Sequence, residues 1–131
     1  MNNNHMIMLV DDDVIHNFIT EHFLKDNYPP IQVIAFINPE EALQYIKSIP
    51  ENRELSFPDV IFLDINMPLM NGWEFLEEYM KMDLHHISPS KIYILSSSLD
   101  PADISKAQHF NVVSGFISKP LSPDKVNDIL K

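Results

Sequence analysis

Short, continuous apolar runs alternate along this chain with longer stretches that mix apolar and polar residues. Each run is bounded by turn-forming or charged residues, as in Met6-Ile7-Met8-Leu9-Val10, which is followed by Asp11-Asp12-Asp13. Runs of this kind are typical of strands buried on both faces of a parallel sheet. They predict strands at about residues 6–10, 31–36, 59–63, 91–95 and 115–118.

The stretches between these runs predict helices. Asn38-Pro39 and Asp100-Pro101 each place an N-cap residue before a proline at the first helical position. Helices are predicted at about residues 14–26, 39–50, 73–82, 101–110 and from 123 onward. Residues 51–58 and 85–90 are expected to form loops, and Asn71-Gly72 a turn.

Apolar residues at helical spacing define the face of each helix that is expected to pack on a core. They are Val14, Ile15, Phe18, Ile19 and Phe23 in the first helix, Ala42, Leu43, Ile46 and Ile49 in the second, Trp73, Leu76, Tyr79 and Met80 in the third, and Val126, Ile129 and Leu130 in the last.

Five strands alternating with five helices indicate a doubly wound (βα)₅ fold of the α/β class. Because crossover connections are almost always right-handed, the parallel sheet should be covered on both faces. The order of the strands cannot be read from the pattern. If it is 2-1-3-4-5, the carboxyl ends of strands 1 and 3 flank the point where ligands bind. Both of these strands lead into aspartates, Asp11 and Asp64.

Length and composition favour one soluble domain spanning residues 1–131, with its core from about residue 6. The chain contains no cysteine, which excludes disulfides and thiolate metal sites. Its apolar runs are far shorter than the roughly 20 residues needed to span a bilayer. The N-terminal residues lack the features of a signal peptide, so a cytoplasmic location is expected.

The net charge argues against direct binding of nucleic acid. The chain has 19 acidic residues against 9 Lys and Arg, giving a formal charge of -10. Binding to a phosphate backbone depends on clustered Lys and Arg, and the sequence contains no such cluster.

Aspartates at the ends of two strands point to a cation site. One Asp would explain a cap on the first helix, but Asp11-Asp12-Asp13 with Asp64 opposite exceeds that need. Clustered carboxylates repel one another unless a cation or a proton relieves them. Mg²⁺ prefers oxygen ligands of this kind, so Asp11, Asp12 and Asp64 are candidate ligands.

The fourth and fifth strands add three candidate residues of lower specificity. Lys119 follows the fifth strand and suits phosphate oxygens, although a lysine in such a place is often merely solvated. Ser96 offers a hydroxyl, and Phe116 is as consistent with an ordinary core aromatic as with a special role. The six histidines show no metal-ligand spacing; His16, His22 and His109 are expected to be structural or solvated, as are His85-His86 in their loop.

The chain resembles the receiver domain of two-component response regulators, in particular single-domain receivers of the chemotaxis-regulator kind. The motifs that carry the resemblance are Val10-Asp11-Asp12, Leu63-Asp64-Ile65-Asn66-Met67-Pro68 with Gly72 downstream, Leu95-Ser96-Ser97, and Phe116-Ile117-Ser118-Lys119-Pro120. Each motif alone is weak, but their order at four strand ends is highly specific. The resemblance covers about residues 6–131 and implies a flavodoxin-like three-layer sandwich with strand order 2-1-3-4-5.

The resemblance implies a phosphoacceptor site. Asp64 would take a phosphoryl group from a histidine kinase or a histidine phosphotransfer protein, forming 4-aspartylphosphate. Mg²⁺, or alternatively Mn²⁺, would be held by Asp12, Asp64 and the backbone carbonyl of Asn66, with help from Asp11. Lys119 would pair first with Asp64 and then with the phosphoryl group. The domain would assist its own phosphorylation and dephosphorylation but would not otherwise be an enzyme.

The resemblance also implies a switch and an output. Ser96, where threonine is commoner, would move toward the phosphate, and Phe116, where tyrosine is frequent, would follow by packing alone. The bond before Pro120 would be cis. A downstream protein would bind the face made by residues 101–110, the fifth strand and the last helix.

Three other functions stay open on the sequence. An aspartate-nucleophile phosphatase would need a second acid where Asn66 stands. A flavin-binding module would place its phosphate against Asp11-Asp12-Asp13, which would repel it. A degenerate receiver, acting only as an interaction module, is disfavoured because the acceptor and metal residues are all present.

Overall fold

The computed structural model describes residues 5–84, 90–97 and 100–130. The strands are β1 (Met6–Val10), β2 (Gln32–Phe36), β3 (Val60–Asp64), β4 (Lys91–Ser96) and β5 (Val113–Ser118). The helices are α1 (Val14–Asn27), α2 (Pro39–Ser48), α3 (Gly72–Lys81), α4 (Pro101–Ala107) and α5 (Pro123–Leu130), with a 3-10 turn η1 at Ile49–Glu51. Every predicted strand and helix is present, in the predicted order.

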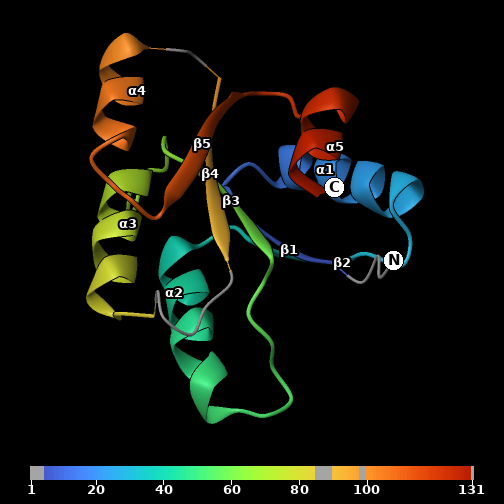
Figure 1. The fold of residues 1–131 in the computed structure, drawn as a ribbon, viewed down its shortest axis with the longest axis horizontal. Helices are drawn as coiled ribbons and strands as arrows, with labels where there is room; N and C mark the ends of the chain where they lie inside the picture. Colours follow the sequence, from blue (N-terminus) through green and yellow to red (C-terminus); the bar gives the residue numbers. More distant parts are fainter. Residues whose placement is uncertain (1–4, 85–89, 98–99, 131) are drawn as a thin grey trace.

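All five strands are parallel, and their order across the sheet is β2-β1-β3-β4-β5. Helices α1 and α5 cover one face, and α2, α3 and α4 cover the other (Figure 1). The doubly wound (βα)₅ fold and its strand order are therefore confirmed. The direction in which successive strands are added to the sheet reverses between β1 and β3. This switch point lies beside Asp11, which follows β1, and Asp64, which ends β3.

The sheet separates two apolar cores. The larger core joins the sheet to α2, α3 and α4 and contains Met8, Ile61, Phe75 and Leu76, among others. The smaller core joins the sheet to α1 and α5, through Leu24 and Val126. Every residue of β3 is buried, as expected for the central strand of a sheet covered on both faces.

Several boundaries differ from the predictions because local hydrogen bonds and packing decide them. Asn71 is the N-cap of α3 and forms a capping box with Glu74, so Asn71-Gly72 begins the helix and is not a separate turn. The helix α4 ends at Ala107, earlier than predicted, and β5 begins at Val113, since Phe110 and Val113 already pack against the larger core. Most of the predicted 85–90 loop, with His85-His86, lies outside the described residues.

The apolar stripe predicted on the first helix lies on the wrong side. Val14, Ile15, Phe18 and Ile19 are between 59% and 72% exposed, and only Phe23 of that stripe packs against the core. The buried residues of α1 are Asn17, Thr20 and Leu24. The Asn17 amide donates to the Asp11 carbonyl at 2.8 Å, and Leu24 joins the smaller core. These contacts turn the apolar stripe toward solvent.

The other predicted inner faces hold with two exceptions. Met80 on α3 is 41% exposed, and Ile129 on α5 is only half-buried. In the described part of the chain, no helix combines the length and the apolar character needed to cross a membrane.

Candidate functional site

Four strands deliver polar side chains to one edge of the sheet. Asp11 and Asp12 follow β1, Asp64 and Ser96 end β3 and β4, and Lys119 follows β5. The carboxylates of Asp11, Asp12 and Asp64 each offer an oxygen that lies within 4.8 Å of the other two. Asp11 and Asp64 are buried and Asp12 is exposed, so the cluster opens to solvent on one side.

The three consecutive aspartates have different roles. Asp13 is the N-cap of α1, and its carboxylate accepts a hydrogen bond from the His16 N–H at 3.1 Å. Asp11 instead lies under the helix start, where its Oδ1 accepts the Asp13 N–H at 2.9 Å. Capping therefore accounts for Asp13 alone and leaves Asp11 and Asp12 to the acidic cluster.

Lys119 is the ammonium group of this site. Its Nζ lies 2.7 Å from Oδ2 of Asp11 and 3.4 Å from Oδ2 of Asp64. The resemblance implied a pair with Asp64, but Asp11 is the nearer partner. The Lys119 N–H donates to the carbonyl of Ser96 at 2.8 Å, and the Lys119–Pro120 bond is cis. The lysine thus bridges the ends of β1, β3 and β4.

The two buried carboxylates differ in acidity. Burial raises the pKa of Asp64 to about 6, and the charge of Asp11 acts in the same direction, against the Asn66 N–H and Lys119. Burial also opposes ionisation of Asp11, but contacts with His16, Lys119 and the Asp13 N–H lower its pKa to about 2. Although burial alone would lower the pKa of Lys119, its contacts with Asp11 and Asp64 raise it. The site thus holds one firmly charged carboxylate beside one that protonates easily.

The loop after β3 is closed tightly on itself. Oδ1 of Asp64 accepts the Asn66 N–H at 3.0 Å, and the Gly72 N–H donates to the Ile65 carbonyl at 3.1 Å. A Cβ at position 72 would lie only 2.7 Å from the Cα of Ile65. Glycine is therefore required for the start of α3 to approach the end of β3, and this approach holds Asn66 beside Asp64.

Ser96 lies at the end of β4, and Phe116 on the neighbouring strand β5 lies beside α4. Ser96 is fully buried at the end of β4, and Phe116 on β5 pairs in register with Ile94. Phe116 is half-buried, packs against the larger core and lines a cavity of about 250 Å³ with Ile104 and Ala107 of α4. The aromatic ring thus connects β5 with α4.

His16, which the sequence pattern predicts to be structural or solvated, lies beside Asp11 in this site. Its Nδ1 lies 3.0 Å from Oδ2 of Asp11, and its side chain is only 15% exposed. The expected apolar stripe would have turned His16 toward solvent, because positions 14, 15, 18 and 19 lie on the opposite side of a helix. A polar inner face at Asn17 and Thr20 was the signal that could have found it.

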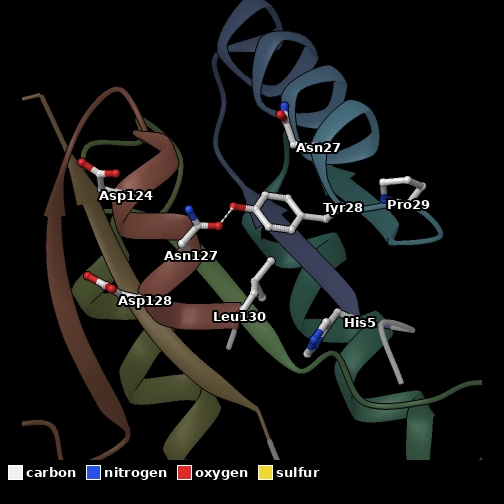
Figure 2. Close-up of a pocket in the computed structure, with 8 residues that line it drawn as sticks. All are labelled: His5, Asn27, Tyr28, Pro29, Asp124, Asn127, Asp128 and Leu130. Carbon is white, nitrogen blue, oxygen red and sulfur yellow. Dashed lines mark hydrogen bonds between the residues drawn. The ribbon is translucent and has the colours of Figure 1, made fainter. Parts of the chain in front are cut away.

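A second concave region lies away from the acidic cluster. Figure 2 shows this pocket, of about 720 Å³, between the start of β1, the end of α1 and α5. The Tyr28 hydroxyl donates to the Asn127 side chain across it, and His5 and Leu130 line its lower part. None of the candidate site residues line this pocket, so the chemistry lies at the opposite ends of the strands.

Together, the fold and the site define an α/β signalling domain of the receiver class. The sequence matches the response regulator receiver domain over residues 7–131. The chain belongs to this family, which functions in two-component signalling.

Individual relatives agree with this assignment. The chemotaxis protein CheY of Listeria monocytogenes is 28% identical over 95% of this chain and 94% of its own. A protein-glutamate methylesterase/protein-glutamine glutaminase of Bacillus licheniformis is 36% identical over 95% of this chain, which spans about a third (33%) of that protein. The crystal structure of a two component response regulator from Cytophaga hutchinsonii superposes with a TM-score of 0.83 at 29% identity, covering 98% of this chain and 95% of that one.

Proposed function

We propose that this chain is the phosphoacceptor of a phosphorelay, in which Asp64 takes a phosphoryl group from a histidine kinase or a histidine phosphotransfer protein. The observation that carries the proposal is the gathering of Asp11, Asp12 and Asp64 within 4.8 Å. Lys119 contacts two of these carboxylates. Catalysis of phosphoryl transfer is mostly positioning and electrostatic stabilisation, which such a cluster can supply.

The same residues fit a hard divalent cation, Mg²⁺ or alternatively Mn²⁺. Asp11, Asp12 and Asp64 would offer carboxylate oxygens, and Asn66 its backbone carbonyl. The cluster fits a cation because its negative charge is in excess: among the described residues of the site, three carboxylates face one lysine. When bound, the cation offsets the negative charge on the phosphoryl oxygens.

Asp64 would be the nucleophile of the transfer. One carboxylate oxygen bonds to phosphorus while the bond from phosphorus to the donor imidazole nitrogen breaks, and the imidazole keeps that electron pair. With a pKa of about 6, Asp64 is largely ionised at neutral pH and able to attack. Lys119 would then move to the new phosphoryl oxygens, since an ammonium pairs strongly with phosphate.

The test is phosphorylation by a small donor. Acetyl phosphate with Mg²⁺ should add one phosphoryl group to the wild type and none to Asp64→Asn, as measured by intact mass. Asp12→Ala should lose most of its calorimetric Mg²⁺ binding, whereas Asp13→Ser, which keeps a helix cap, should retain it. Equal labelling of Asp64→Asn would contradict the proposal.

The exposed face of α1, formed by Val14, Ile15, Phe18 and Ile19, is where we expect the phosphodonor protein to dock. This α1 apolar face starts directly after the cap residue Asp13 and so adjoins the rim that a donor imidazole must reach. Clustered exposed apolar side chains are typical of protein interaction sites.

Docking can be separated from chemistry with two donors. Phe18→Ser should slow transfer from a phosphorylated histidine-containing protein that labels the wild type, yet leave labelling by acetyl phosphate unchanged. Asp26→Ser, at the far end of α1, is the matched control and should affect neither reaction. If Phe18→Ser slows both reactions equally, the α1 apolar face is not the docking surface.

We expect the phosphorylated chain to signal through the surface formed by α4, β5 and α5. Ser96 lies on β4 beside β5, and Phe116 of β5 lines a cavity with Ile104 and Ala107 of α4, so a Ser96 hydroxyl drawn toward the phosphate would change how Phe116 packs there. The phosphoryl group would then bias an existing equilibrium, and a downstream protein would bind α4, β5 and α5. Hydrogen exchange with beryllofluoride should change protection in α4 and β5; changes confined to the surroundings of Asp12 and Asp64 would contradict this route.

A further inference from the structure

The ring of His16 is buried beside the acidic cluster without a well-formed hydrogen bond. Its Nδ1 lies 3.0 Å from Oδ2 of Asp11, at contact distance. Both ring nitrogens are nevertheless buried, and neither has a hydrogen bond of good geometry among the described residues. Buried polar atoms are almost always satisfied, so this exception calls for an explanation.

Two side chains share one oxygen of Asp11. Lys119 lies 2.7 Å from Oδ2, and His16 lies 3.0 Å from the same atom. The other oxygen, Oδ1, is held by the Asp13 N–H. In the present state Lys119 is the closer partner and makes the hydrogen bond to Oδ2, whereas the His16 contact with the same atom is not a well-formed hydrogen bond.

Phosphorylation of Asp64 would draw Lys119 away from Oδ2 of Asp11. Lys119 already lies 3.4 Å from Asp64, and it would follow the phosphoryl oxygens once they form there. Asp11 would then lose its nearest partner at Oδ2. The backbone of His16 is held in place for this contact, because its N–H donates to the Asp13 carboxylate and the neighbouring Asn17 amide donates to the Asp11 carbonyl.

We propose that His16 is a positioning residue that donates a ring N–H to Oδ2 of Asp11 when Lys119 moves to the phosphoryl group. The inference rests on the proposed function. It makes His16 the residue that keeps Asp11 oriented toward the cation in the phosphorylated state. Outer partners of metal-binding carboxylates have this effect in general, and their loss typically weakens binding by about 10- to 100-fold.

The test compares three substitutions in the full chain. His16→Asn puts an amide N–H near the position of Nδ1, His16→Gln puts it near that of Nε2, and His16→Leu has no donor. Beryllofluoride, which stands for the phosphoryl group, is titrated by calorimetry at saturating Mg²⁺. We expect His16→Leu and His16→Gln to weaken beryllofluoride binding by about 10-fold or more and His16→Asn to retain most of it.

Mg²⁺ alone provides the second reading. Without beryllofluoride Lys119 still holds Asp11, so each variant should weaken Mg²⁺ binding by a smaller factor than it weakens beryllofluoride binding. Thermal unfolding without metal checks that each variant folds, and if His16→Leu fails to fold, the comparison of His16→Asn with His16→Gln decides. Equal beryllofluoride binding by all variants, or binding by His16→Asn as weak as that of His16→Gln, would overturn the inference. A wild type that binds no Mg²⁺ would instead refute the proposed function and, with it, the inference.

Discussion

The β1–α1 and β3–α3 units are built on the same plan but use their helices in opposite ways. In each, a buried strand leads to an aspartate of the site and then to a capped helix. The helix α3 buries its large apolar residues, including Trp73 and Leu76, whereas α1 exposes Phe18 and its apolar neighbours. Helical spacing therefore identifies an apolar face, but it does not say whether that face packs on the core or on another molecule.

Their aspartates differ as well. The pKa of Asp11 is about 2, and that of Asp64 is about 6. Both are buried, but His16 and Lys119 engage Asp11 closely, while Asp64 meets the charge of Asp11 and a more distant lysine. These contacts stabilise the charged form of the carboxylate that would only hold a metal, and the proposed nucleophile is left the more basic.

The largest expected difference between the two units is in stability. Leu76→Ala on α3 removes a fully buried side chain and should lower the free energy of unfolding by about 2–5 kcal/mol. Phe18→Ala on α1 should change it by no more than about 0.5 kcal/mol, since its side chain is exposed. Urea denaturation measures both. A loss of similar size for Phe18→Ala would mean that the α1 apolar face is packed.

The next largest difference is between the effects of Asp64 and Asp11 on the free energy of unfolding, measured in metal-free buffer with a chelator. The folded-state pKa of Asp64, about 6, exceeds the ordinary 3.8, so its contribution to stability is lost as the pH rises from about 4 through 6. Asp64→Asn should therefore raise the free energy of unfolding at pH 7 by about 1–3 kcal/mol.

Asp11 should respond with the opposite sign. Its folded-state pKa of about 2 lies below 3.8, so its contribution is present above pH 4 and is lost as the pH falls toward 2. Asp11→Asn should lower stability at pH 7 by about 1–2 kcal/mol. Urea denaturation at pH 7 and pH 4 would decide, and shifts of the same sign for both substitutions would disprove the contrast.

The smallest expected effect on the free energy of unfolding concerns the hydrogen bond that orients α1. Asn17→Ala removes the buried hydrogen bond to the Asp11 carbonyl and should cost about 1 kcal/mol. Asn27→Ala is the matched control, because its amide makes a similar bond to the Phe23 carbonyl in an exposed place, and its loss should cost less. Guanidinium denaturation can resolve the two. Equal costs would show that the Asn17 contact does not anchor the helix.

The sequence was sufficient to predict what depends on neighbouring residues. Continuous apolar runs located the strands, and Asn38 and Asp100 cap α2 and α4 as expected. It was insufficient where distant segments decide. The reversed face of α1 depends on a bond from Asn17 to the end of β1, and the preference of Lys119 for Asp11 depends on the packing of β5 against the rest of the sheet. The burial of His16 beside Asp11 was not predicted for the same reason, since its position follows from the orientation of α1.

Position 72 shows how a single methyl group could disturb signalling from a distance. The start of α3 can approach Ile65 only because Gly72 has no side chain. Replacing it with alanine would force apart two backbone segments that meet directly behind Asp64. The chain would still contain every acidic and basic group of the site, yet the aspartate would no longer face its neighbours correctly. The placement of the reactive group thus depends on an empty space that no inventory of functional side chains would include.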